Sequence, residues 1–507
     1  MKLLLVEITC PDIRAFGVRS LASFVKTAGH TVNILFLPPF FEQLRPESGT
    51  VHLYPDRIIT DFLKLSKQFD LVGISFLTYY FDRAVQLTQS IHDKLDIAVI
   101  WGGIHATTRP EECLQHADMV CLGEGEEALV ELLDTLERDG DIKAIKNICS
   151  RHKGQIFTNP VRPLIKDINS LPFPDYDLKT HYAYSIFDDA IVPLNDRLMK
   201  FFSEAGPLSQ LGTYYQYKTM ASRGCPHHCA FCCNSIYREM YRHEKYLRWR
   251  SNEMLFQEIE SALQAVPYFN SIMFFDDSFF AMPNKVMKNF TAEYKERIGL
   301  PFATQSSPQT TNAQKLDYLT DAGMVYLEMG IQTGSDRINS MYKRKQTQAQ
   351  VLQAAQAINA VTGKILPPDY HLILDNNWET DADVLETLDL VLRLPRPFGL
   401  KPSSLVLYPG TELFRIAQEE GLITDEKEDV YRKAFGAPKS TYLNLLILMV
   451  NYSFIPLGLV RFLKRPFFLK HFNKNSWHPL FSAVRTVIHF TDRARRKIKK
   501  LTKRRGR

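Results

Sequence analysis

Three cysteines stand close together in the middle of the chain. Cys225, Cys229 and Cys232 follow one another at spacings of four and three residues, in a polar segment with the sequence SRGCPHHCAFC. Thiolates at these spacings suit a loop that wraps around one inorganic cluster. Iron–sulfur clusters are usually held by four cysteines, so a set of three leaves one iron free to bind another molecule.

Zinc is the alternative for this cysteine set. A zinc ion would need a fourth ligand, which His227, His228 or Cys233 could provide. Structural zinc sites usually combine two separated ligand pairs, and no second cysteine pair occurs in this sequence. The spacing therefore favours an iron–sulfur cluster.

The distribution of all eight cysteines indicates a reducing compartment. Four of them lie within nine residues and the others are scattered, whereas a secreted disulfide framework would be small and would spread its cysteines. The first apolar run is interrupted by Glu7, too early for a signal peptide. We therefore predict a cytoplasmic protein.

The complete pattern, C-x3-C-x-Φ-C with Phe231 as the aromatic residue, resembles the signature of the radical S-adenosylmethionine (SAM) superfamily. The resemblance implies a [4Fe–4S] cluster on the three cysteines, with SAM bound to the fourth iron. It also implies cleavage of SAM to a 5′-deoxyadenosyl radical, with electrons from an external donor of the flavodoxin or ferredoxin type. Such radicals remove hydrogen from unactivated carbon, while the protein positions the reactants.

Segments downstream of the cysteines resemble the SAM-binding turns of this family. Asp276 and Asp277 end a predicted strand, where relatives place residues near the SAM amino group. Gly330, Gln332 and Gly334 resemble the segment that lies along the SAM ribose, although many relatives carry Glu at the position of Gln332. An amide can still hydrogen-bond to hydroxyls.

Two further turns fit the same order. Glu379, within Leu374–Thr380, resembles the turn after the fifth barrel strand, and Leu407–Thr411 resembles the turn after the sixth. Other roles remain open for some of these residues. The two aspartates at 276 and 277 could cap a helix, and the glutamine at 332 could serve packing instead of SAM contact.

Glycines and polar residues also stand at the ends of strands predicted in the first 140 residues. Glycines there let the backbone approach a large ligand closely. The arrangement resembles the N-terminal domain of cobalamin-dependent radical SAM enzymes and implies a cobalamin site. The residues implicated are Ser75, Gly102, Gly103, His105, Gly123, Glu124 and Gly125.

One departure from that resemblance concerns the lower axial ligand of the cobalt. Many cobalamin proteins supply it from Asp-x-His-x-x-Gly after the first strand, and here that loop, Thr9–Gly17, contains no His. We expect cobalamin to bind without a protein imidazole; the alternative is a vestigial domain. For His105 we expect hydrogen bonds to backbone or corrin amides.

Two series of alternating strands and helices must position these residues. Buried apolar strands between helices indicate parallel sheets with ligands at the carboxyl ends of the strands. The first series predicts strands at Leu3–Val6, Thr31–Leu37, Leu71–Phe76, Ile97–Trp101 and Met119–Leu122. The second predicts strands at Thr219–Arg223, Ser271–Phe275, Phe302–Ser306, Val325–Ile331, Tyr370–Leu374 and Ser404–Leu407.

The expected fold class is α/β. A Rossmann-like, flavodoxin-type cobalamin-binding domain is predicted at 1–140, followed by a linker at 141–215. A partial (βα)6 barrel, related to the TIM barrel, is predicted as the radical SAM core at 216–430. The remainder, 431–507, is predicted to be a helical extension with apolar and basic segments.

Charge is concentrated at the C-terminal end. The chain carries +6 overall, but Thr491–Arg507 holds ten Lys or Arg and one Asp, so it contributes +9 and the rest about −3. Nineteen uncharged residues, Tyr442–Val460, precede this tail. The combination predicts an interfacial helix pair on an anionic membrane, peripheral at its inner face. The alternative is a helical subdomain packed on the barrel, and nucleic-acid binding is not expected.

The leading functional hypothesis is cobalamin-dependent C-methylation of an unactivated carbon, with a lipid as one substrate class. The first alternative is radical SAM chemistry with another outcome, namely carbon–carbon coupling, cyclisation or oxidation. The second is a cobalamin- or metal-binding sensor without catalysis.

Overall fold

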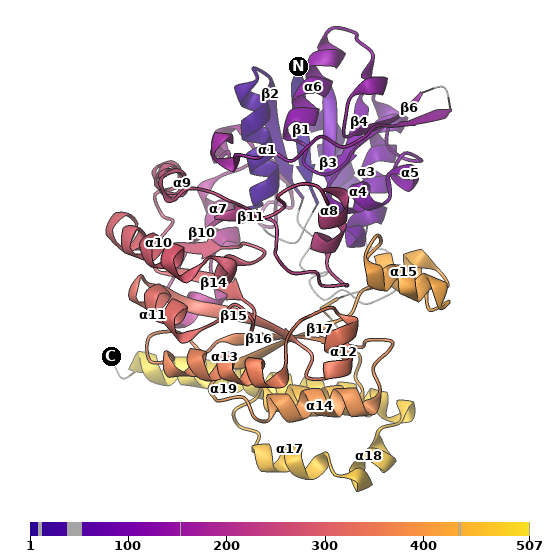
Figure 1. Cartoon of the computed structure of the whole chain (residues 1–507). Coiled ribbons are helices and arrows are strands. Elements are labelled where there is room, and N and C mark those ends of the chain that lie inside the picture. The colour runs from indigo at the N-terminus through magenta and orange to yellow at the C-terminus, as the bar shows by residue number, and fades with distance from the viewer. Residues whose placement is uncertain (9–12, 38–52, 153, 434, 437, 506–507) are drawn as a thin grey trace. The chain divides into compact units, whose positions relative to one another are not determined.

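The computed structural model describes residues 1–8, 13–37, 53–152, 154–433, 435–436 and 438–505 (Figure 1). The chain divides into two compact units. The first unit comprises Met1–Gln305, Asp317–Tyr326 and Val406–Ala434. The second unit comprises Ser306–Leu316, Leu327–Leu405 and Phe435–Arg507.

A nine-stranded sheet forms the core of the N-terminal part of the first unit (Figure 1). Its order is β7-β6-β5-β4-β3-β1-β2-β8-β9. The neighbours from β5 to β8 pair in parallel, and β6, β7 and β9 are antiparallel. The strands are β1 (Lys2–Glu7), β2 (Thr31–Phe36), β3 (Leu71–Ser75), β4 (Ala98–Gly102), β5 (Met119–Cys121), β6 (Ile148–His152), β7 (Gln155–Thr158), β8 (Tyr182–Ser185) and β9 (Ala190–Pro193).

The first five strands have the order expected of a flavodoxin-type domain. Read from β2 across to β5 the order is 2-1-3-4-5, which places a topological switch point between β1 and β3. The central strand residues Leu3, Leu4, Ile34 and Val72 are fully buried, as expected for a parallel sheet covered on both faces. Ligands bind such sheets outside the carboxyl ends of the strands at the switch point.

Helices connect these strands. They are α1 (Phe16–Thr27), α2 (Asp56–Ser66), η2 (Thr78–Tyr80), α3 (Phe81–Lys94), α4 (Ile104–Thr108), α5 (Pro110–Cys113), α6 (Glu126–Glu137), η3 (Ile142–Ala144), η4 (Ile168–Ser170), η5 (Leu178–Thr180), α7 (Asp196–Ser203) and η6 (Gly206–Gln210).

The segment expected to be a linker, 141–215, differs from that expectation. It supplies β6 to β9, which extend both edges of the N-terminal sheet. These strands are four or five residues long, and β6 and β7 carry several exposed side chains. Short edge strands lack the long buried apolar run that marks a central strand, so the sequence pattern did not distinguish them from loop.

The second sheet has six strands in sequential order, β10-β13-β14-β15-β16-β17. Its pairs β10–β13, β13–β14, β15–β16 and β16–β17 are parallel, and helices separate its strands in the chain, which confirms the partial (βα)6 barrel. The strands are β10 (Gln216–Thr219), β13 (Ser271–Phe274), β14 (Phe302–Ser306), β15 (Met324–Gln332), β16 (Asp369–Leu374) and β17 (Gly399–Ser404).

Local sequence explains where two of the helices after these strands begin. α13 and α14 each begin with a capping box, built by Thr347 with Gln350 and by Thr380 with Asp383. The helices are α8 (Cys233–Met240), α9 (Asn252–Ala265), η7 (Phe279–Ala281), α10 (Asn284–Arg297), α11 (Ala313–Asp321), α12 (Asp336–Met341), α13 (Gln348–Ala360), α14 (Asp381–Val391), α15 (Glu412–Glu419) and the π-helix η8 (Lys427–Tyr431).

The C-terminal extension is helical. It consists of α16 (Tyr442–Val450), α17 (Leu457–Leu463), α18 (Pro466–Phe472), η9 (Asn475–Trp477) and α19 (His478–Arg505). All nine residues of α16 are buried, and α16 packs against α14. The prediction that Tyr442–Val460 forms an interfacial helix is therefore wrong for α16, because tertiary packing covers its apolar surface. Among the described residues, no helix has the length and hydropathy needed to cross a bilayer.

Candidate active site at the cysteine loop

The three cysteines lie on one loop between a short strand and a helix. β11 (Ser222–Arg223) precedes the loop and pairs antiparallel with β12 (Arg248–Trp249), and α8 begins directly after Cys232. Cys225 is buried, and Cys229 and Cys232 are half-buried. The backbone N–H of Cys232 donates to the carbonyl of Cys229 at 3.1 Å, so the loop is locally closed.

The loop begins at a position that only glycine can fill. Gly224 has φ +95°, and a Cβ there would lie 2.5 Å from the carbonyl oxygen of Tyr246. Both facts exclude a side chain. The Nη1 of Arg238 then donates to the carbonyl oxygen of Cys225 at 2.9 Å, which fixes the first cysteine against α8.

The thiols are close enough to affect one another's ionisation. Burial raises the pKa of Cys225 to about 12, with smaller contributions from the charges of Asp277, Cys232 and Cys229. A hydrogen bond with the Cys233 thiol is the main cause that lowers the pKa of Cys232 to about 7. The cysteines thus form one donor set whose chemistry fits an iron–sulfur cluster.

Asn234 contacts the last cysteine of the loop. Its Nδ2 lies 3.8 Å from the Sγ of Cys232, and its Oδ1 accepts a hydrogen bond from the hydroxyl of Tyr246 at 2.6 Å. Phe231, the aromatic residue of the pattern, is half-buried within the loop. Cys233 is exposed.

Asp276 holds the segment that precedes the cysteine loop. Its carboxylate accepts hydrogen bonds from the backbone N–H of Ala221 at 3.0 Å and from the hydroxyl of Ser222 at 2.6 Å. Burial raises its pKa to about 7. This bonding ends β10 at Thr219, earlier than the predicted strand Thr219–Arg223, because a carboxylate replaces the sheet partner.

Asp277 faces the cysteines instead. It is exposed, and its backbone oxygen lies 3.9 Å from the Sγ of Cys225. The two neighbouring aspartates therefore have different contacts: Asp276 bonds to the segment before the loop, and Asp277 lies beside the first cysteine.

The predicted ribose segment belongs to the second unit and contains a β-bulge. The pairing of β15 with β16 shifts between Gly330 and Gln332, and Gln332 has φ +71°. Its side-chain nitrogen would lie 2.8 Å from a Cβ at Gly330, and Arg344 donates to the Gly330 carbonyl at 2.7 Å. Bulges redirect side chains next to functional sites, and this one sits at the end of the strand.

Gly334 and Glu379 lie near α14 in the same unit. A Cβ at Gly334 would be 2.7 Å from the Cα of Thr387, and the Gly334 N–H donates to the Thr387 hydroxyl at 2.9 Å. Burial raises the pKa of Glu379 to about 7. Asp375, at the start of the turn, accepts hydrogen bonds from Lys439 N–H and from Asn444 of α16, both at 2.8 Å. The C-terminal extension thus supports this turn.

A polar layer on the same strands was not predicted. Glu328 of β15 accepts a hydrogen bond from His371 of β16 at 2.9 Å and pairs with Lys401 of β17. Register places Gly330 beside His371. These residues share a face of the sheet because side chains alternate along a strand. The sequence did not predict the polar layer, because its residues lie in separate segments of the chain.

The predicted cobalamin residues gather at the carboxyl edge of the N-terminal sheet. Register aligns Glu7, Ser75 and Gly102 across β1, β3 and β4. A Cβ at Gly102 would meet nothing within 4 Å, so this edge is open there. Gly103 has φ +94°, and a Cβ would lie 2.8 Å from the Phe76 carbonyl. An open edge lined by glycine backbone fits a large planar ligand.

His105 is not available at that edge as a metal ligand. It is fully buried, its Nδ1 lies 3.2 Å from the Thr78 hydroxyl, and its ring packs against Phe76, Phe81 and Tyr431. Burial lowers its pKa to about 3, with a further contribution from the charge of Arg109. Part of the first-strand loop, residues 9–12, lies outside the described residues.

The segment Gly123–Gly125 contacts the cysteine region directly. A Cβ at Gly123 would lie 2.1 Å from the hydroxyl of Tyr241, which follows α8. Glu124 pairs with Arg248 at 2.6 Å and with Arg223 at 3.3 Å. Arg223 and Arg248, both missed by the sequence analysis, therefore connect the N-terminal sheet to the strands that flank the cysteines.

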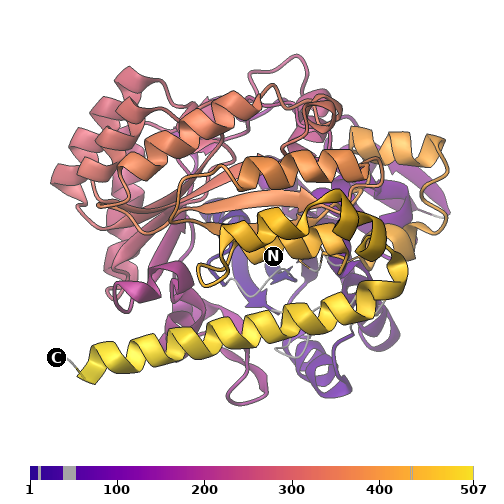
Figure 2. The same ribbon diagram turned by 90° about the horizontal axis from the view of Figure 1, so that it is seen from below.

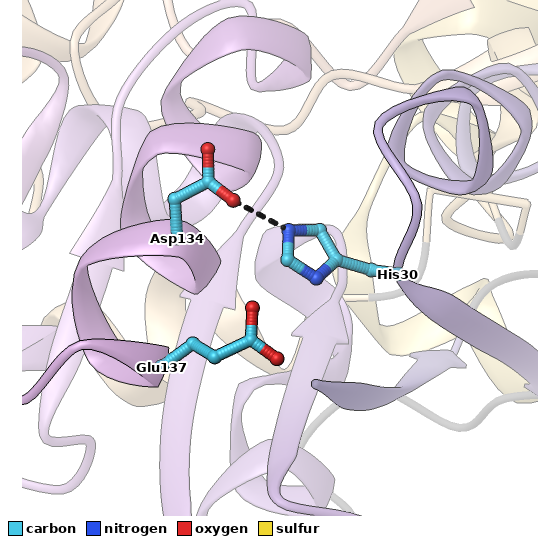
Figure 3. Close-up of side chains that lie close together, drawn as sticks. All are labelled: His30, Asp134 and Glu137. Carbon is cyan, nitrogen blue, oxygen red and sulfur yellow. Dashed lines mark ion pairs between the residues drawn. The ribbon is translucent and has the colours of Figure 1, made fainter.

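A separate group of potential ligands lies at the opposite edge of the N-terminal sheet. His30 immediately precedes β2 and faces Asp134 and Glu137 of α6 (Figure 3). Its Nε2 lies 3.2 Å from Asp134, and the amine of Met1 donates to Glu137 at 3.0 Å. These contacts form an ion-pair cluster at the amino ends of the strands, away from the carboxyl edge where the predicted cobalamin residues lie.

Comparison with protein families identifies the domains to which the two sheets belong. Residues 220–391 match the model of the radical SAM superfamily, and residues 7–133 match the model of the B12 binding domain. This chain is a radical SAM enzyme with an N-terminal B12-binding domain. The cofactors of this B12-binding radical SAM enzyme are accordingly a [4Fe–4S] cluster, SAM and cobalamin.

Curated relatives of this B12-binding radical SAM enzyme include methyltransferases. An uncharacterized methyltransferase of Pyrococcus horikoshii is 24% identical over 407 residues, which cover 79% of this chain and 81% of the relative. Cytidylyl-2-hydroxyethylphosphonate methyltransferase of Streptomyces wedmorensis is 24% identical over 64% of this chain and 62% of its own. Anaerobic magnesium-protoporphyrin IX monomethyl ester cyclase of Cereibacter sphaeroides is 23% identical over 70% of this chain and 54% of its own.

Solved structures show the same fold. The methyltransferase TsrM of Kitasatospora setae, with tryptophan and a SAM analogue bound, aligns over 82% of this chain and 76% of its own, at TM-score 0.61 and 16% identity. The cobalamin-dependent enzyme OxsB, with aqua-cobalamin and SAM bound, aligns over 88% and 65%, at TM-score 0.63 and 16% identity. At such identities the likeness concerns the fold alone.

Proposed function

We propose that this enzyme uses cobalamin and SAM to methylate an unactivated carbon. The observation that carries the proposal is the joining of two modules in one unit: Arg223, two residues before Cys225, pairs with Glu124 of the B12-binding domain. A cluster loop held against a cobalamin domain suits a reaction that needs both cofactors together. Several relatives named as methyltransferases support the same outcome.

Particular residues would hold the cluster and SAM. Cys225, Cys229 and Cys232 would bind three irons, and Phe231 and Asp277 would border the open iron. Asp276 would hold the loop through Ala221 and Ser222. When bound, the cluster and SAM supply a carbon radical at the 5′ position of deoxyadenosine, and cobalamin supplies the methyl group.

The SAM-binding roles expected of four residues in the second unit are also part of the proposal. Gly330 and Gly334 let this segment pack closely on its neighbours, since a Cβ at either would meet one at 2.8 or 2.7 Å. Gln332, held at φ +71°, offers an amide to hydroxyl groups. Glu379 would accept or share a proton, because burial raises its pKa to about 7.

Cobalamin would lie at the carboxyl edge of the N-terminal sheet. Ser75, Gly102 and Gly103 would lie beneath it, and Gly123–Gly125 would border it while also contacting Tyr241. His105 would support this edge from within the core and would not reach the cobalt, since it is fully buried among aromatic rings.

A different radical outcome is the second candidate. The relative from Cereibacter sphaeroides is named as a cyclase, so ring formation or oxidation is compatible with the same two modules. The sensor without catalysis, which the sequence left open, does not stand because this chain is a radical SAM enzyme. The domain divisions expected from the sequence at about 215 and 430 are part of the proposal, whereas 141–215 belongs with the N-terminal sheet.

The electron donor and location are also proposed. We expect a small flavodoxin or ferredoxin to reduce the cluster in the cytoplasm. We further propose that the enzyme works peripherally at the inner face of an anionic membrane, with a lipid or membrane-soluble substrate. The basic C-terminal segment supports this location.

Mass spectrometry of lipids and small metabolites, with and without the protein, tests the reaction. Methylation adds one CH2 to a product, whereas coupling, cyclisation or oxidation removes hydrogen or adds oxygen. A cell producing the Cys229→Ala variant is the matched control, since only the cluster is lost. A product that lacks hydrogens and carries no added methyl group would favour the second candidate over the first.

A further inference from the structure

The last part of the chain exposes large apolar side chains that α16 does not cover. In α17 and α18, Leu459 is 44% exposed, Phe462 45% and Phe467 65%. Figure 1 shows α17 and α18, in yellow, beyond α14 of the same unit. Exposed aromatic side chains gathered on consecutive helices mark an interaction surface on a soluble domain.

Basic residues alternate with these apolar ones, and acids are absent. From Leu457 to Leu480 the sequence contains Arg461, Lys464, Arg465, Lys470 and Lys474 and no Asp or Glu. Four of the five basic residues are exposed, and Lys464 pairs with Asp389. This segment therefore presents apolar and basic side chains, with one of its five basic residues paired to an acid of α14.

α19 continues the pattern with a stripe of its own. Leu480, Ala483, Val487 and Phe490 are all exposed and recur at intervals of three and four residues, so they share one face of the helix. Val487 is 64% exposed and Phe490 66%. Figure 2 shows α19 as one long continuous helix, and its C-terminal half carries most of the basic tail.

We propose that this face, made by α17, α18, η9 and the first half of α19, docks on an anionic bilayer. This inference rests on the proposed peripheral location and moves the anchor from Tyr442–Val450, which is buried, to Leu457–Phe490. Apolar side chains enter the boundary between headgroups and acyl chains, while Arg and Lys meet the phosphates. Charge complementarity selects an anionic surface, and protruding aliphatic and aromatic side chains select a bilayer over a nucleic acid.

The contacts beneath this face reach the turn that leads to Glu379. α16 lies under it and packs against both α14 and α17. Asn444 of α16 donates to Asp375 in the turn that leads to Glu379. Docking would therefore place a bilayer on the helical layer that supports the proposed SAM turn.

Flotation of the reconstituted full-length enzyme tests the proposal. The probes are vesicles of phosphatidylcholine alone and vesicles in which a quarter of the lipid is phosphatidylglycerol, at low and at high salt. We expect flotation with the anionic vesicles, weakened by salt but not abolished, because apolar burial is insensitive to screening. The double variant K470Q/K474Q should reduce partitioning about fivefold for each charge removed.

Matched variants distinguish binding through this face from nonspecific adsorption of the protein to vesicles. Phe467→Ser should reduce flotation at every salt concentration, whereas Val286→Ser, at a residue 47% exposed on α10, should not. K285Q/K288Q on α10 is the charge control. Trp477, 37% exposed, should be quenched by brominated lipids, and the W477F variant identifies that signal.

The outcomes are distinct. Failure of the wild-type enzyme to float with anionic vesicles overturns the proposal, as does equal binding by Phe467→Ser. Competition by RNA that removes all vesicle binding would assign the face to nucleic acid, and a dimer dispersed by Phe467→Ser would assign it to a second copy. SAM cleavage is measured separately, so failure of the docking face leaves the proposed chemistry standing.

Discussion

Arg223 donates from Nη2 to a carboxylate oxygen of Glu126 at 2.6 Å, across 97 residues of sequence. The same guanidinium lies 3.3 Å from Glu124, which also holds Arg248 at 2.6 Å. Arg223 immediately precedes Gly224 and Cys225, so the cysteine loop starts from a residue fixed to the B12-binding domain. The ion-pair network therefore sets where the loop begins.

Removing the shared carboxylate should destabilise this junction. Glu124→Gln leaves Arg248, 5% exposed, and Arg223 with one counter-charge between them, and we expect a loss of about 3 kcal/mol in the free energy of unfolding. Glu239→Gln is the control, because the Glu239–Arg242 pair is exposed and worth under about 1 kcal/mol. Urea unfolding of the apoprotein measures both, and equal effects would contradict the role of the network.

The cysteine loop should bind about four irons and four sulfides after anaerobic reconstitution. Cys225→Ala, Cys229→Ala and Cys232→Ala should each abolish the cluster absorbance and SAM cleavage, because each removes one of three ligands. Cys233→Ala should keep both, since that thiol is not part of the C-x3-C-x-Φ-C pattern. Full activity in Cys232→Ala would refute the assignment.

Cobalamin should bind without a histidine below the cobalt. His105 is fully buried with its Nδ1 against Thr78, and the described part of the first-strand loop contains no His. Electron paramagnetic resonance of the Co(II) form should show no nitrogen superhyperfine splitting from an imidazole. Observation of that splitting, or absence of bound cobalamin, would overturn the prediction.

His105 should also make stability depend on pH. Burial lowers its pKa from 6.5 to about 3 in the folded state, so the unfolded chain binds the proton first. Stability is therefore complete above pH 6.5 and is lost as pH falls toward 3, by up to a few kcal/mol. His105→Phe keeps a ring among Phe76, Phe81 and Tyr431, and it should lose less stability than the wild type between pH 6.5 and 4. Parallel curves for the two proteins would rule out a neutral buried His105.

Gly334 should tolerate no side chain. A Cβ there would lie 2.7 Å from the Cα of Thr387, so Gly334→Ala must displace α14 at a cost of about 1–3 kcal/mol. We expect weaker SAM binding as well, measured by equilibrium dialysis of the reconstituted enzyme. Gly363→Ala, where a Cβ meets nothing within 4 Å, should change neither quantity.

The sequence by itself determined the parallel strands of the two sheets and predicted the ligands of the cluster. Cys225, Cys229 and Cys232 could be predicted as ligands because a loop that wraps one cluster needs its ligands close together in the chain. The central strands could be predicted because burial on both faces demands continuous apolar runs, as in Leu3–Val6 and Leu71–Phe76.

Only the tertiary structure decided which residues from distant parts of the chain contact those elements. Arg223 and Glu124 are 99 residues apart in the chain. No local spacing predicts a pair between β11 and the segment that follows β5. Nor could periodicity tell that Tyr442–Val450 is buried while Leu459 and Phe467 are exposed. An apolar segment has the same composition against a helix as against a lipid, so its partner depends on what the rest of the chain packs there.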